Sequence, residues 1–142
     1  INEEEFYLRL GKAFTFFEKA TYTSVSTDDL AYAGMSMSAI KLGNLLDAKN
    51  CGDKALSVGE KSFLSLKKII AENGDIGVAS KDSSIVKLGD VSLKNFKTCV
   101  AAYKKKQEFN GGYIEIDNMN CENYYKEASI DVNSKILKNY EF

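Results

Sequence analysis

The sequence predicts an all-α protein in which about five helices form an irregular bundle. Apolar residues recur at intervals of three and four positions along most of the chain, which is the spacing of one helix face. Proline is absent, so no residue fixes φ or removes a backbone donor inside a long helix. With 142 residues, 44% of them hydrophobic, the chain fits one domain, and we expect residues 1–142 to form a single helical domain.

Two helices are predicted in the first 50 residues. The first follows the N-cap Asn2 and ends at the hydroxyl-rich run 21–26. The second begins at Ser26 or Thr27 and ends at 49–52, and its small central side chains predict that it lies at the centre of the bundle. The two buried stripes are expected to be Phe6, Leu10, Ala13, Phe17 and Ala20, and then Leu30, Ala33, Met37, Ile40 and Ala48.

Three more helices are predicted in the rest of the chain. One covers residues 53–72, although the capping-box spacing of Ser57 and Glu60 also allows a later start or a break near Gly59. The next runs from the N-cap Ser92 to the glycine turn at 110–112. The last covers residues 120–140. Their apolar faces are expected to be Leu56, Gly59, Phe63, Leu66 and Ile70; Leu93, Phe96, Val100 and Tyr103; and Tyr125, Ala128, Val132, Ile136 and Tyr140.

The segments between these helices are expected to be irregular. Residues 74–91 are rich in glycine, aspartate and serine, which predicts a loop with one short helix over 83–88. Residues 113–116 alternate like a strand, and their best candidate partner is 76–78, so a minor hairpin near 74–78 and 113–116 is allowed. No internal repeat or low-complexity tract is evident in the sequence.

Three cysteines, Cys51, Cys99 and Cys121, permit one disulfide. In the helical arrangement Cys99 lies about 16 Å before the end of its helix, and residues 111–120 are long enough to return over that distance. This predicts a Cys99–Cys121 bridge, with three reduced thiols as the alternative. A bridge requires an oxidising compartment, so we expect a secreted or periplasmic protein. The start at Ile1 rather than Met fits signal cleavage and simple trimming equally well.

The composition argues against several kinds of chemistry. The chain has no histidine, which excludes Ser-His-Asp and Cys-His catalysis, and it has no Cys-x-x-Cys pair for zinc. Its net charge of −1, with Arg9 as the one arginine, disfavours nucleic-acid binding. No apolar run is long enough to span a bilayer. We therefore expect no enzyme, no metal and no cofactor.

Aromatic residues gather near the end of the chain and suggest a binding surface. Tyrosine combines a large contact area with a polar tip and is enriched in protein interfaces. The predicted partner-binding residues are Tyr113, Met119, Tyr124, Tyr125 and Tyr140, although the same tyrosines can simply line the edge of the core. The function predicted is a non-catalytic protein-binding module, such as an inhibitor, immunity protein or adaptor. The alternative is a helical carrier of an apolar small ligand.

Overall fold

The computed structural model describes residues 21–25, 39–41, 45–51 and 53–140, and these residues form strands, turns and loops without a helix. The prediction of an all-α bundle is therefore wrong. The described parts of four predicted helices, those over 26–49, 53–72, 92–110 and 120–140, are strands with turns or loops between them. The predicted helix over 2–20 lies outside the described residues.

The described residues form eight strands of one sheet, and most of these strands pair in parallel. Strands β5, β6 and β7 are long and form its centre, in the order β1-β3-β5-β6-β7-β8, while β2 and β4 also pair with β5. Among the described strands, only β1 and β3 pair antiparallel. The strand bounds are Thr21–Val25 (β1), Ala39–Lys41 (β2), Leu45–Lys49 (β3), Lys54–Val58 (β4), Phe63–Lys81 (β5), Ile85–Tyr103 (β6), Tyr113–Ile130 (β7) and Lys135–Lys138 (β8).

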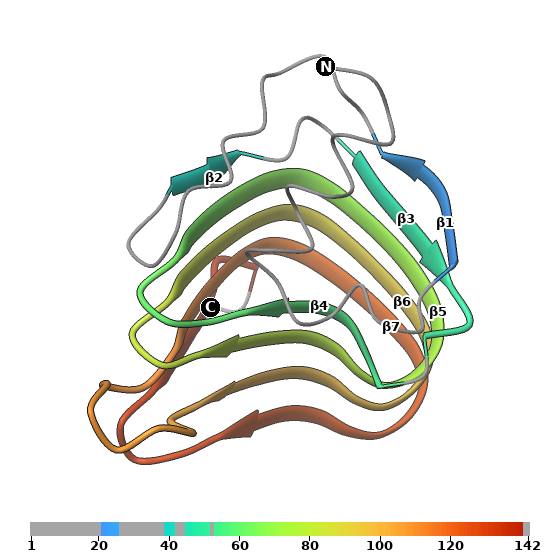
Figure 1. The fold of residues 1–142 in the computed structure, drawn as a ribbon. Helices are drawn as coiled ribbons and strands as arrows, with labels where there is room; N and C mark the ends of the chain where they lie inside the picture. Colours follow the sequence, from blue (N-terminus) through green and yellow to red (C-terminus); the bar gives the residue numbers. More distant parts are fainter. Residues whose placement is uncertain (1–20, 26–38, 42–44, 52, 141–142) are drawn as a thin grey trace.

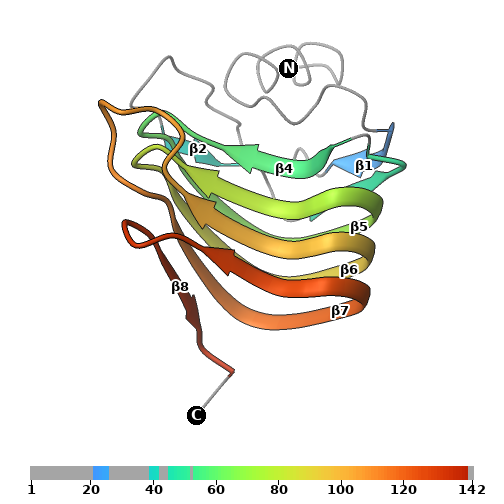
Figure 2. The ribbon, with the colours of Figure 1, turned by 90° about the horizontal axis from the view of Figure 1, so that it is seen from below.

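The register shows that the chain repeats a structural unit. Residues paired between β5 and β6 lie 22 positions apart, as Phe63 with Ile85, and the same spacing joins β4 to β5 and β7 to β8. Between β6 and β7 the spacing is 28, because residues 104–112 form a longer connection. Each long strand bends back on itself, and successive turns stack like the coils of a spring (Figures 1 and 2). The architecture is a parallel β-solenoid, and the expectation of no internal repeat is wrong.

The spacing of the buried residues explains why the sequence resembles a helix. In the first half of β5 the inward residues are Leu64, Leu66, Ile69 and Ala71, at intervals of two, three and two. The interval of three arises where two neighbouring lysines, Lys67 and Lys68, both face solvent. Intervals of two, three and two sum to the seven residues of two helical turns, so a bent strand imitates an amphipathic helix.

The core lies inside the coils and is built from columns of aligned side chains. Leu64, Val86 and Ile114 occupy one register position in three successive coils, and each is fully buried. Because every coil contacts only its neighbours, stability comes from each coil and from the interfaces between adjacent coils.

A ladder of asparagines marks one corner of the solenoid. Asn50, Asn73, Asn95 and Asn123 follow one another in successive coils, and each has a positive φ between 55° and 64°. The side-chain amide nitrogens of Asn73, Asn95 and Asn123 each donate to the amide oxygen of the preceding asparagine, at 3.1, 3.0 and 2.7 Å. Asparagine tolerates the left-handed conformation better than most residues, and stacked amides satisfy one another along the axis. The ladder therefore fixes the bend in every coil.

The short elements predicted between the helices also differ from the structure. Residues 113–116 are indeed a strand, but they pair with 85–88 and 135–138, whereas 76–78 pairs with 54–56 and 98–100. The expected hairpin between these segments is wrong, because β6 separates them in the sheet. The short helix predicted over 83–88 is a turn followed by the start of β6.

Candidate functional site

The five residues predicted to bind a partner all lie in one coil, residues 113–140, which we name the last coil. It comprises β7, a turn and β8. Within the described residues this coil closes one end of the solenoid, because β7 pairs with β6 on one side and only with the short β8 on the other (Figure 2).

Within the part of the chain that the structure describes, most of β7 has no partner strand on its outer side. β8 pairs with Tyr113–Ile116, and the backbone N–H of Asn139 donates to the carbonyl oxygen of Ile116 at 2.9 Å. Beyond that point no other described strand pairs with this side of β7. We name residues 117–130 the open edge. Backbone groups along such an edge are free to pair with another strand.

Large apolar side chains are exposed on and beside the open edge. Tyr125 is 90% exposed, Tyr124 44%, Ile130 53% and the neighbouring Val132 100%. Among the described residues, the other large apolar side chains with high exposure are Ile85 and Leu137, so four of the six lie in 124–132. Exposed apolar residues gathered in this way mark an interaction surface more often than scattered ones do.

The structure separates the five predicted residues into three places. Tyr124 and Tyr125 line a hollow of about 290 Å³ together with Asn95, Lys97 and Asn123, next to the asparagine ladder. Met119 and Tyr140 pack against the core and line a second hollow, in which Lys68 and Asp90 also take part.

Tyr113 lies apart from the other four, in the stretch that β8 covers. Its hydroxyl donates to Glu115 at 3.3 Å, and partial burial together with this carboxylate raises the pKa of Tyr113. Of the predicted set, Tyr124 and Tyr125 alone lie on the open edge with their side chains largely accessible.

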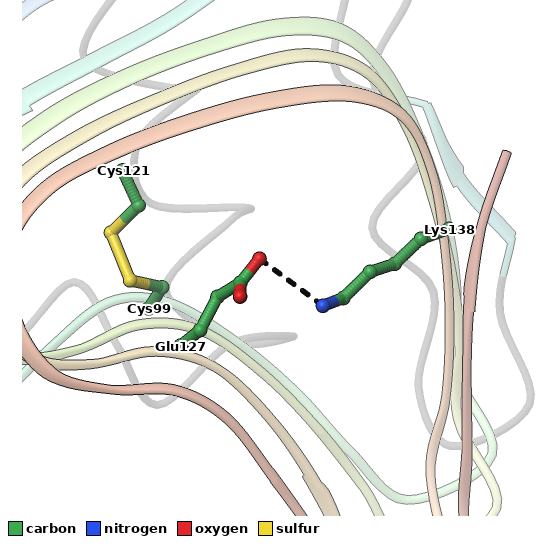
Figure 3. Close-up of a disulfide and its surroundings, with 4 residues drawn as sticks. All are labelled: Cys99, Cys121, Glu127 and Lys138. Carbon is green, nitrogen blue, oxygen red and sulfur yellow. Dashed lines mark hydrogen bonds and ion pairs between the residues drawn. A yellow bond between two sulfur atoms is a disulfide. The ribbon is translucent and has the colours of Figure 1, made fainter. Parts of the chain in front are cut away.

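The interior of the last coil ends in charged groups. Lys138 follows Ile116 in its register position, and Glu127 follows Cys99, because its neighbours pair with Thr98 and Val100. The Lys138 ammonium lies 3.1 Å from the Glu127 carboxylate, as Figure 3 shows. Two positions that are apolar in earlier coils thus carry an ion pair here.

A disulfide joins Cys99 to Cys121 across the inside of the coils (Figure 3), with 6.4 Å between the two Cα atoms. This is the pairing expected from the sequence, but helices do not bring the residues together. Cys99 lies in the second half of β6, whereas Cys121 lies in the first half of β7, so the bridge ties two neighbouring coils. One coil earlier, a side chain at Gly77 would collide with Leu93, which already fills that space.

The third cysteine, Cys51, is free and buried. Burial raises the pKa of its thiol to about 11, which keeps it protonated and unreactive at neutral pH.

No comparison identifies a relative. The chain matches no protein-family model, no curated protein and no solved structure. Among the described residues no cluster of three or more histidine, cysteine or acidic side chains is placed to hold a metal ion. The same part of the chain contains no helix long and apolar enough to cross a membrane.

The sequence reading missed the asparagine ladder and the charged pair at the end of the core. The ladder leaves a signal, because Asn73, Asn95 and Asn123 recur at intervals of 22 and 28 residues. That signal is visible only when a repeat is sought first. The sequence holds no signal for the ion pair of Glu127 and Lys138. The chain has 39 charged residues, and only the strand register shows that these two lie close together inside the coil.

A second polar cluster anchors the connection between β6 and β7. Asp82 is buried, and one of its oxygens accepts from the backbone N–H groups of Lys105 and Lys106 at 2.7 and 2.8 Å. The Lys106 side chain pairs with Glu60. Burial, together with Lys105 and Lys54, lowers the pKa of the neighbouring Lys81. These contacts hold the longer connection against the coils, and we assign them a structural role.

Proposed function

We propose that this chain is a non-catalytic protein-binding module that contacts its partner through the open edge of β7. The observation that carries the proposal is an unpaired edge next to exposed Tyr124, Tyr125, Ile130 and Val132. A strand added to such an edge gains main-chain hydrogen bonds, and neighbouring side chains supply specificity. The rigid coils behind the edge keep it extended before a partner arrives, which lowers the entropic cost of binding.

The disulfide supports a location outside the reducing cytosol. A bridge between Cys99 and Cys121 fits an oxidising compartment. We accordingly propose that the protein is secreted or periplasmic, where such a bridge persists.

The helical carrier is not proposed again, because the described residues contain no helices between which a ligand could lie. Large side chains such as Phe96, Leu93 and Leu64 also fill the interior of the coils.

Photocrosslinking tests the proposed surface. A photoreactive phenylalanine analogue replaces Tyr125 on the open edge or, as the matched control, Ser92 on the exposed outer face of β6. Each protein is irradiated in extract of its native source, and covalent adducts are identified by mass spectrometry. We expect a defined protein adduct from position 125 and none from position 92. Equal labelling from both positions, or no adduct from 125, would contradict the proposal.

A point substitution complements the crosslinking. Tyr125→Ala removes an exposed side chain, so it should change the free energy of unfolding by less than about 0.5 kcal/mol. It should nevertheless weaken partner recovery. Unchanged recovery with Tyr125→Ala would count against the tyrosine surface as the contact.

A further inference from the structure

We propose that the outer face of the coils carries a binding site for a small zwitterion, a free α-amino acid with an apolar side chain. The site is a hollow of about 210 Å³ over the first halves of β5, β6 and β7. Two lysines, Lys67 and Lys87, and two acids, Glu115 and Asp117, line it together with Gly89. Its walls therefore carry both charges that an amino acid carries, with opposite signs available for each.

The hollow keeps its shape whether or not a strand is added to the open edge. β5 and β6 carry its lysines, and β8 already pairs with the stretch of β7 that carries Glu115 (Figure 2). Asp117 is held from the same side, because the side-chain amide of Asn139, directly after β8, donates to its carboxylate at 2.9 Å. The inference is thus separate from the proposed function, and each can fail without the other.

A glycine separates opposite charges in one row of the hollow. The register places Lys67, Gly89 and Asp117 side by side in three successive coils. A Cβ atom at position 89 would lie 2.3 Å from the carbonyl oxygen of Lys67, so the close approach of these coils leaves no room for a side chain there. The row therefore has a positive end, a gap and a negative end.

The charged groups around this gap do not neutralise one another. Among the described residues, none of the four takes part in an ion pair. The Lys87 ammonium lies over the ring of Phe63, 5.9 Å from its centroid. Glu115 accepts hydrogen bonds from neutral donors, the Tyr113 hydroxyl and the Asn139 amide, both at 3.3 Å. Neutral donors leave the charge in place, so two positive and two negative groups remain for a ligand.

The width of the gap fits one amino acid better than a peptide. Two strand spacings, about 9.6 Å, separate the rows of Lys67 and Asp117, and side chains stand roughly perpendicular to a sheet. Two charge-assisted hydrogen bonds of about 2.8 Å each leave about 4 Å for the distance between the ligand's charged atoms. One α-amino acid places its ammonium and carboxylate about 3 Å apart, whereas a dipeptide adds about 3.5 Å.

An apolar row beside the hollow fits the side chain of the ligand. Phe63, Ile85 and Tyr113 pair in register two positions before the row of Lys87, and so they lie on the same outer face. Ile85 is 39% exposed. Covering exposed apolar surface adds affinity, so an apolar amino acid should bind more tightly than glycine.

Titration of the full-length chain with L-leucine, followed by amide chemical shifts in NMR spectra, tests the inference. We expect saturable shifts over residues 65–67, 87–89 and 115–117, with a dissociation constant of about 1 mM or below. Three probes each remove one feature of the ligand: L-leucinamide lacks the carboxylate, 4-methylpentanoate lacks the ammonium, and glycine lacks the apolar side chain. Each probe should bind at least about fivefold more weakly than L-leucine.

Substitutions assign each charge of the ligand to one end of the row. Lys67→Gln should weaken L-leucine at least about fivefold and leave L-leucinamide unchanged, because that probe has no carboxylate. Asp117→Asn should weaken L-leucine and leave 4-methylpentanoate unchanged. The matched control Lys94→Gln, on the exposed outer face of β6, should bind L-leucine like the wild type, and thermal melting checks that each variant is folded.

Three results would overturn the inference. The first is the absence of any shift up to about 20 mM L-leucine. The second is binding of L-leucine that neither Lys67→Gln nor Asp117→Asn weakens. The third is a probe that lacks a charge or the apolar side chain and yet binds as tightly as L-leucine.

Discussion

The middle coils and the last coil share one repeat, yet their surroundings differ. β5 and β6 each have a parallel neighbour on both sides over most of their length, and their buried residues are apolar except Ser80 and Lys81 at the end of β5. β7 has β6 on one side and little on the other, and its inward positions include Glu127. The comparison teaches that in a solenoid the presence of a neighbouring coil, more than the local sequence, decides whether the residues of a strand are buried or exposed.

The largest expected loss of stability concerns one register position that the middle coils and the last coil share. Phe96 in β6 is 2% exposed, whereas its register partner Tyr124 in β7 is 44% exposed. Phe96→Ala should lower the free energy of unfolding by about 3–5 kcal/mol, because it empties a packed site. Tyr124→Ala should cost about 1 kcal/mol or less. Chemical denaturation measures both, and equal losses would show that the last coil is packed like the middle ones.

The disulfide between the two regions should have the next largest effect. Replacing both Cys99 and Cys121 by alanine reopens a loop of 22 residues and should cost about 3 kcal/mol. The matched control is Cys51→Ala, which leaves the bridge in place. A reducing agent should then lower the melting temperature of the wild type and of Cys51→Ala, but not that of the double variant. An equal response of all three proteins would mean that the bridge does not form.

The asparagine ladder allows a finer comparison. Asn95 donates to Asn73 and accepts from Asn123, while Asn123 makes a single ladder bond. Glycine keeps the positive φ without strain, so Asn95→Gly isolates the loss of two hydrogen bonds and should cost about 2 kcal/mol. Asn123→Gly should cost about half as much. Equal costs at the two positions would show that the amides do not act as a ladder.

The effect of the buried Cys51 thiol is the smallest at neutral pH and develops only at high pH. The pKa of this thiol is about 11 in the folded chain, above the ordinary thiol value of 9.0. The folded state therefore holds its proton longer than the unfolded state, and the stability present below pH 9 is lost as the pH rises toward 11. Urea titrations from pH 8 to 11 should show a smaller loss for Cys51→Ala than for the wild type. Parallel curves for the two proteins would refute the contribution of this thiol.

Part of this structure could be predicted from the sequence. The predicted tyrosines lie in one coil because they are close along the chain. Residues that are close along the chain stay in the same region in any compact fold. The bridge between Cys99 and Cys121 was reached through an incorrect helical geometry, because a helix and a coil both return the chain over the distance between these residues.

The strands could not be distinguished from helices by apolar spacing alone. In β6 the inward residues Leu93 and Phe96 are three apart because the ladder corner at Asn95 shifts the alternation, and Phe96 to Cys99 adds another interval of three. These are the intervals of a helix face. The repeat was obscured by the longer connection 104–112, which changes one spacing from 22 to 28. The open edge depends on which strands pair, and only the fold reveals that.

Hydrogen–deuterium exchange of the dilute monomer tests the central claim most directly. In a parallel sheet the N–H groups of alternate residues point to opposite neighbours, so about half of the amides along 117–130 should face the open side and exchange rapidly. The corresponding amides along 89–102 of β6 should be protected throughout. We predict a fast-exchanging half in the first segment and none in the second. Equal and complete protection of both segments would contradict an open edge on β7.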